Sequence, residues 1–157
     1  MEDGPYYEDI ELGSEIRIGR GRTITEADNI WFTLLTNNTN QIHFNRDYTQ
    51  KYYPGPPFNG RLVVNGLLTL SIAIGLTTRY TSDRGIMLGI NNVKFHNPVF
   101  PGDTIYVDMK ITDKRESRSR PGYGIVSIHH IVRKQDGSIV MEFDRVIMVP
   151  KKGARWE

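Results

Sequence analysis

Residues 62–78 read LVVNGLLTLSIAIGLTT, the longest apolar run in the chain. Apolar side chains fall on every side of a helix drawn through this run. It therefore predicts a helix over Leu62 to Thr78 that other elements enclose. Asn65, Thr69 and Ser71 interrupt the run, which is also shorter than the roughly 20 residues needed to cross a bilayer. We expect a buried helix and no membrane partner.

Four strand-like segments follow this run: Ile86–Val99, Thr104–Thr112, Tyr123–Lys134 and Ile139–Val149. Thr104–Thr112 alternates cleanly between apolar and polar residues, which is typical of a half-solvated antiparallel strand. Asp136-Gly137 is a strong hairpin signal between the last two segments. Successive strands with short turns predict a meander, so we expect an α+β fold in which a curved antiparallel sheet wraps around the long central helix.

The first third of the chain predicts a short strand over Glu15–Gly19, then a helix that begins after Thr25 and ends near Asn37. Thr25 with Asp28 three residues later forms a weak capping box. The apolar residues of this helix share one face: Ile30, Trp31, Leu34 and Leu35. Residues 47–53 predict a short helical turn. We expect one domain over residues 1–157, with a core at about 7–149 and a short tail at 150–157.

Composition excludes several classes of protein. The chain of 157 residues has no cysteine, so disulfides, thiolate zinc sites and cysteine nucleophiles are excluded. A net charge of +2 gives no argument for nucleic acid as a partner. The start, Met1-Glu2-Asp3-Gly4, lacks the apolar core of a signal peptide, so we expect a cytoplasmic protein. A single sheet has an edge that needs cover, which favours a dimer.

One histidine stands apart from the other three. His43 ends the polar loop that starts at Thr36, and Gly66 opens the apolar run. A base in a loop beside a backbone N–H at a helix start can serve as proton acceptor and oxyanion site. His96, His129 and His130 belong to predicted strands, and the last two point to opposite faces. With no sensible ligand spacing, we expect no metal site.

Three motifs together resemble a known family: Asn40-x-Ile42-His43, Val64-Asn65-Gly66, and residues 97–103, which read NPVFPGD. From about Tyr7 to Val149 the chain resembles the MaoC-like, or R-specific enoyl-CoA hydratase, branch of the hotdog fold. The resemblance implies hydration or dehydration of a short 2-enoyl-CoA thioester by a homodimer. It implies no cofactor beyond the coenzyme A of the substrate.

Two shorter segments, Phe32–Thr39 and Lys114–Pro121, are similar to the mesaconyl-CoA hydratase subgroup, which acts on branched C4-dicarboxylic enoyl-CoA thioesters. One departure from the general family pattern concerns the acid of its Asp/His pair. Asn38 occupies the position of the family's Asp. Asn65 occupies the position of the histidine that usually precedes the helix glycine. The Asn of the family's pattern corresponds to Asn40.

The resemblance assigns roles to these residues. His43 carries proton transfer and the Gly66 N–H binds the thioester oxygen, while Asn38 and Asn40 position water and the loop. Asn65 joins them as a substrate-binding residue. Each role has a plainer alternative: a surface histidine for His43, turns and caps for the asparagines, and close backbone packing for Gly66.

The segment Lys114–Arg120 is basic and lies between two predicted strands. Arg115, Arg118 and Arg120 are candidates for binding a phosphate or a substrate carboxylate, because the guanidinium group suits bidentate contact with both. The alternative is a solvated hairpin turn. A nucleic-acid role is not favoured, because no aromatic residues are interleaved with the arginines.

Two other functions stay open at this point. A hotdog thioesterase would need a carboxylate at the thioester carbonyl, and the nearby candidates are Asp28 and Asp47. An acyl-CoA-binding protein without activity, or an inactive partner subunit of a true hydratase, is the second alternative because Asn38 replaces the family's acid.

Overall fold

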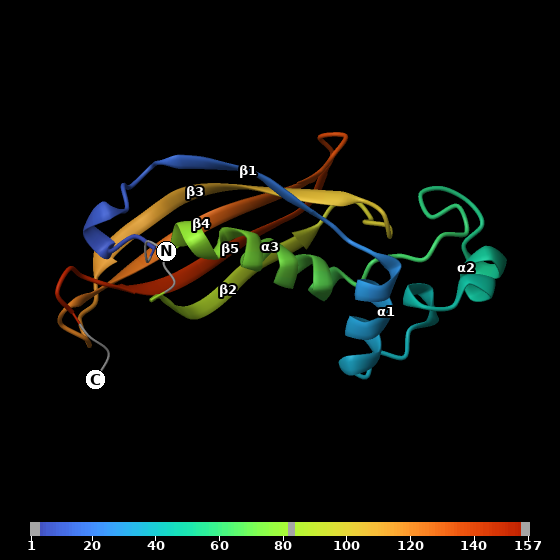
Figure 1. The fold of residues 1–157 in the computed structure, drawn as a ribbon, viewed down its shortest axis with the longest axis horizontal. Helices are drawn as coiled ribbons and strands as arrows, with labels where there is room; N and C mark the ends of the chain where they lie inside the picture. The colour runs from blue at the N-terminus through green and yellow to red at the C-terminus, as the bar shows by residue number, and fades with distance from the viewer. Residues whose placement is uncertain (1–3, 82–83, 155–157) are drawn as a thin grey trace.

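The computed structural model describes residues 4–81 and 84–154, in which one antiparallel sheet curves along one long helix (Figure 1). The strands are β1 (Glu15–Thr23), β2 (Ile86–Phe95), β3 (Thr104–Glu116), β4 (Tyr123–Lys134) and β5 (Ile139–Pro150). The α-helices are α1 (Glu26–Leu35), α2 (Arg46–Tyr52) and α3 (Gly66–Thr81), and short 3-10 turns span Tyr7–Asp9 and Gln41–His43. The predicted α+β fold is confirmed. Residues 1–3 and 155–157, which include part of the expected tail, lie outside the described residues.

The sheet has the order β1-β3-β4-β5-β2. The meander is confirmed for β3, β4 and β5. The expectation that the first segment, β2, lies next to β3 in the sheet is wrong, because β2 pairs with β5 at the opposite edge. The connection after β2 crosses the sheet end. His96 N–H donates to Val140 O at the β5 side, and Ile24 N–H donates to Asp103 O at the β1 side. These two hydrogen bonds hold the loop on both sides of the sheet. As a result β2 and β3, which follow one another in the sequence, lie apart in the sheet.

The inner face of the sheet forms the core. In β3 the residues predicted to share a face are all buried: Ile105, Val107, Met109 and Ile111. The hairpin signal is also confirmed, since β4 and β5 pair antiparallel and Gly137 has φ +83°. Only a residue that tolerates the left-handed region suits this turn.

The long helix α3 begins later than predicted. Residues 62–65 are not helical, because Val63 N–H donates to Ile42 O and Val64 N–H donates to Val99 O. The helix is also not enclosed within this chain. Leu68 and Ala73 are buried with the core, whereas Leu67 is 58% exposed. One apolar side of α3 therefore remains uncovered in the single chain.

Helix α1 begins where expected. Thr25 Oγ1 accepts from Asp28 N–H at 3.1 Å, and Asp28 Oδ2 accepts from Thr25 N–H at 2.8 Å. These hydrogen bonds hold the pKa of the Asp28 carboxyl below its ordinary value. The apolar face of the helix lies outward, with Trp31 77% exposed, and its buried residues are polar.

Candidate active site

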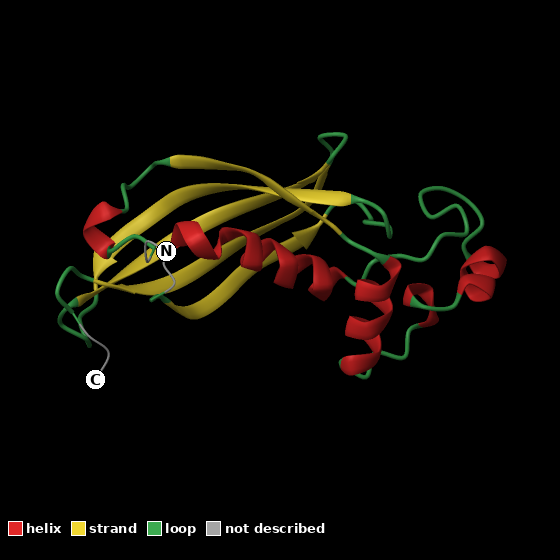
Figure 2. Cartoon of the chain, viewed as in Figure 1, coloured by secondary structure: helices red, strands yellow, loops and turns green. Residues whose placement is uncertain are grey.

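Helices α1 and α2 and the loops around them gather at one end of the sheet, beyond the start of α3 (Figure 2). The polar loop that follows α1 ends in the turn Gln41–His43. The segment that precedes α3 runs beside this turn, because Val63 N–H donates to Ile42 O. The fold therefore brings the two stretches singled out in the sequence, the histidine loop and the helix start, to the same place.

The ring of His43 is held by a backbone carbonyl. Nδ1 lies 2.8 Å from Val63 O, and a carbonyl oxygen can only accept, so Nδ1 carries the hydrogen. The lone pair of the neutral ring is then on Nε2. Within the described residues, Nε2 has no hydrogen-bond partner. His43 is half-buried, so this tautomer presents an available proton acceptor.

A fully buried amide, Asn29 in α1, ties the site together. Its Nδ2 donates to His43 O at 2.8 Å and to Val63 O at 3.0 Å. Its Oδ1 accepts from Asn65 N–H at 2.8 Å. Sequence reasoning missed this residue. The signal available was a polar pair, Asn29 and Thr33, spaced four apart on one side of the helix.

Asn65, predicted to bind substrate, caps α3. Its Oδ1 accepts from Leu67 N–H at 3.0 Å, and its Nδ2 donates to Thr33 Oγ1 at 3.3 Å. Within the described residues, the N–H groups of Gly66 and Leu68 make no hydrogen bond. A helix start with unpaired N–H groups carries a partial positive charge, so it can bind an oxygen that gains negative charge.

A pocket of about 280 Å³ opens beside this helix start. Gly66 lines it, and a Cβ at this position would lie 2.7 Å from the ring of Phe95. The close packing expected as the plainer reason for Gly66 is therefore present together with the free N–H. The walls are largely apolar and include Val63, Val64, Phe95, Val99 and Val140. Val63 thus both lines the pocket and holds the His43 ring.

Asn38 and Asn40 shape the loop. Asn38 Oδ1 accepts from Asn40 N–H at 2.9 Å, and Asn40 Oδ1 accepts from Ile42 N–H at 3.3 Å. Asn37, with φ +55°, ends the helix in the left-handed region. The turn and cap roles considered for these asparagines are thus present, and their NH2 groups are the side-chain atoms left for a ligand.

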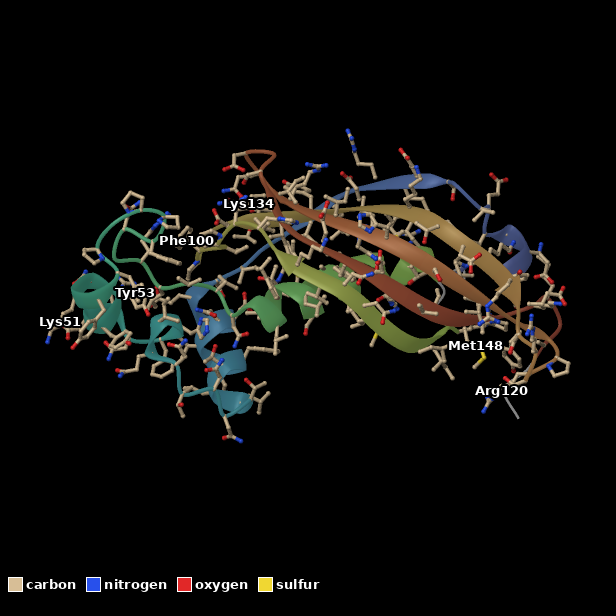
Figure 3. All side chains as sticks on the ribbon, turned by 180° about the vertical axis from the view of Figure 1, so that it is seen from behind. Lys51, Tyr53, Phe100, Arg120, Lys134 and Met148 are labelled. Carbon is tan, nitrogen blue, oxygen red and sulfur yellow. The ribbon has the colours of Figure 1, made fainter. Side chains whose placement is uncertain are left out.

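The three candidate arginines lie far from His43 within one chain. Arg115 is eleven residues along β3 from Thr104, a distance of about 36 Å at the rise of an extended strand. Arg120 lies in the turn before β4, at the opposite end of the molecule from Tyr53 and Phe100 (Figure 3). One chain does not bring these arginines and the histidine together.

In residues 4–81 and 84–154, no three histidine or carboxylate side chains are grouped so that they could hold a metal ion. No helix in the same residues has the length and apolarity needed to cross a membrane.

Comparison with known proteins identifies the family of the chain. The family model described as "MaoC like domain" matches residues 9–134. The chain belongs to the MaoC-like family. The resemblance to this family that the sequence motifs predicted is confirmed.

Two relatives and one solved structure show what this MaoC-like chain is similar to. It is 29% identical to an (R)-specific enoyl-CoA hydratase from Rhodospirillum rubrum, over 94% of each chain. It is 28% identical to a mesaconyl-CoA hydratase from Haloarcula hispanica, over 96% of this chain and 41% of the relative. A Mycobacterium tuberculosis protein with a double hotdog fold superimposes with a TM-score of 0.83 at 22% identity, over 98% of this chain and 46% of that chain.

The likeness to a double hotdog protein confirms the predicted hotdog fold. The MaoC-like chain spans less than half the length of that protein and of the mesaconyl-CoA hydratase.

Proposed function

We propose that this MaoC-like chain adds water to, or removes it from, a short 2-enoyl-CoA/3-hydroxyacyl-CoA thioester of the branched C4-dicarboxylic type. The carrying observation is the hydrogen bond from His43 Nδ1 to Val63 O, which leaves Nε2 as a base beside the segment that leads to Gly66. The names of the two hydratase relatives support the same reaction.

In the hydration direction, the oxygen of water forms a bond to C3 while one O–H bond breaks and its proton passes to His43 Nε2. The electrons of the C2–C3 double bond move toward the thioester, and the Gly66 N–H stabilises the enolate oxygen. One such donor contributes on the order of 3 kcal/mol. The proton on His43 then passes to C2. Because Asn38 cannot exchange protons at neutral pH, His43 serves as both base and acid.

We further propose a homodimer. β2 is an edge strand, and its side chains include several large exposed apolar residues: Ile86, Met87, Leu88 and Phe95. Phe95 also lines the pocket, so a second subunit seated on this edge would complete its wall. The double hotdog relative, about twice as long as this chain, supports pairing of two such units.

The second candidate is an acyl-CoA-binding domain without turnover, which is favoured by the amide of Asn38 at the family's acid position. Hydrolysis of the thioester has less support. The Asp28 carboxylate is occupied by Thr25 and by Arg22 at 3.0 Å, and Asp47 is exposed in the first turn of α2.

Turnover of mesaconyl-CoA and crotonyl-CoA, followed as loss of the enoyl absorbance and as release of free thiol, separates these activities. We expect absorbance loss without thiol release. His43→Ala should lower the rate at least about 100-fold, the scale of general acid–base catalysis. His129→Ala, on the outer face of the sheet, is the control and should keep the rate. Wild-type activity in His43→Ala would disprove the assignment. Coenzyme A binding without turnover by the wild type would favour the second candidate.

A further inference from the structure

One hydroxyl of α3 behaves unlike the others. Ser71 donates to Leu67 O at 2.8 Å, Thr77 donates to Ile74 O at 2.7 Å, and Thr81 donates to Thr77 O at 3.1 Å. These hydroxyls donate to backbone carbonyls of their own helix, as serine and threonine side chains often do in helices. Thr69 does not. The residue is only 2% exposed, yet its Oγ1 has no hydrogen-bond partner in the described residues.

A buried hydroxyl without a partner destabilises the fold, because it has lost water and gained nothing in return. Threonine is also a poorer helix former than leucine. Most residues that line the pocket with Thr69 are apolar, so valine would fill the same space without an unpaired polar atom. The folded chain alone therefore gives no reason for a hydroxyl at this position.

The position of Thr69 suggests what its hydroxyl binds. Thr69 lines the pocket together with Gly66, three residues before it on the same helix. Three residues correspond to a rise of about 4.5 Å, close to one turn. When the Gly66 N–H binds the thioester oxygen, the acyl atoms that lie about one helical turn further along α3, at the level of Thr69, are C3 and C4.

The unpaired N–H groups at the start of α3 favour an anion in the pocket. The first turn of α3 carries the unpaired N–H of Leu68 as well as that of Gly66, and both add to the positive end of the helix dipole. The one titratable residue among the described residues that line this pocket, His96, is paired with Glu142 at 3.0 Å. Thr69 is thus a hydrogen-bond donor in walls that are largely apolar.

We propose that the Thr69 hydroxyl donates a hydrogen bond to an oxygen at C4 of the acyl group, so that the pocket selects half-thioesters of short dicarboxylic acids. This inference rests on the proposed function, because it places the thioester on Gly66. A threonine χ1 has two populated rotamers in helices, so rotation is enough to turn the hydroxyl toward the ligand.

The test compares mesaconyl-CoA with tiglyl-CoA, which share one branched skeleton and differ at C4 in having a carboxylate or a methyl group. In Thr69→Val the ratio of kcat/KM for mesaconyl-CoA to that for tiglyl-CoA should fall about tenfold or more, the scale of a hydrogen bond to a charged group. The same variant should unfold at a higher temperature without ligand. Ser71→Ala, on the exposed side of α3, is the matched control and should keep the wild-type ratio. An unchanged ratio in Thr69→Val would overturn the proposal.

Binding of saturated thioesters separates this inference from the proposed activity. Succinyl-CoA and butyryl-CoA differ at C4 in the same way but cannot be hydrated. If the wild type turns over no enoyl-CoA yet Thr69→Val weakens succinyl-CoA binding and leaves butyryl-CoA binding unchanged, the hydratase function fails and the Thr69 assignment stands. Equal affinity of wild type and variant for succinyl-CoA, or no binding of it by either, rejects the assignment.

Discussion

At the scale of single residues, the site depends on a side chain that has no part in the chemistry. Asn29 donates to the carbonyl of His43 and to that of Val63, which in turn fixes the tautomer of the imidazole. Its oxygen also holds the N–H of Asn65, the cap of α3. One buried amide thus sets the position of the base relative to the helix start.

Asn29→Asp tests this role. The change keeps the shape of the side chain but replaces both N–H donors with an oxygen that repels the two carbonyls. We expect the free energy of unfolding to fall by about 2 kcal/mol or more, and kcat to fall while His43 is intact. Urea denaturation and steady-state rates measure the two effects. Asn59→Asp, an exposed turn position, is the control. A variant as stable and active as the wild type would contradict this role.

The sequence predicts His43 and Gly66 because each belongs to a motif only a few residues long. It does not predict Asn29, because the three partners of this amide are 14, 34 and 36 residues away along the chain. A helix pattern reports only that a position is polar. Whether the position is buried depends on which segments pack on that side, and that information is not local.

At the scale of helices and strands, the sequence again predicts the features that depend on neighbouring residues and not those that depend on distant segments. The Thr25–Asp28 capping box, the alternation of β3 and the turn at Gly137 each involve neighbours in sequence, and all three are confirmed. The place of β2 and the start of α3 are wrong in the sequence prediction, because both depend on pairing with distant strands and loops. Apolar composition alone cannot distinguish a helical segment from an extended one that is hydrogen-bonded to other segments on both sides, as residues 62–65 are.

The interface between α3 and the sheet contains buried polar side chains as well as apolar ones. Arg145 Nη1 donates to Thr77 Oγ1 at 3.1 Å near the end of α3. His130 is fully buried, and its ring stacks on Phe143 with the centroids 4.4 Å apart. Burial, with the charge of Arg145 as a smaller cause, lowers the pKa of His130 to about 4. At neutral pH this imidazole is therefore uncharged within the core.

This depressed pKa gives the fold a defined dependence on acid. The unfolded chain binds a proton at His130 near its ordinary pKa of 6.5, whereas the folded chain does so only near 4. Stability from the neutral ring is thus present above pH 6.5 and is lost as pH falls toward 4, by about 3 kcal/mol. Urea unfolding at pH 7 and at pH 4.5 measures the loss. His130→Leu should show a smaller loss over this range, and an equal loss in the variant would refute the prediction.

At the scale of the whole molecule, one chain leaves apolar surface uncovered in several places. The outward face of α1, the Leu67 side of α3 and the edge strand β2 all carry large exposed apolar side chains. An exposed edge strand also presents unpaired backbone N–H and C=O groups, which favours pairing with another strand. The predicted need for cover at the sheet edge thus agrees with the exposed surface on β2, although the sequence could not indicate which strand would form this edge.

The proposed homodimer predicts the effect of a charge on β2. Leu88 is 50% exposed in this strand, and a lysine there would be buried without a partner if two copies pair along it. We expect the wild type to have twice the 18.0 kDa mass of one chain by light scattering, and Leu88→Lys to have the mass of one. Leu12→Lys changes a residue ahead of β1 that is somewhat more exposed than Leu88, and it should leave the dimer intact. A monomeric wild type would exclude the homodimer. A dimeric Leu88→Lys variant would move the interface to another face. Because Phe95 lies on the same strand and lines the pocket, a monomer formed by Leu88→Lys should also bind acyl-CoA more weakly than the wild type does.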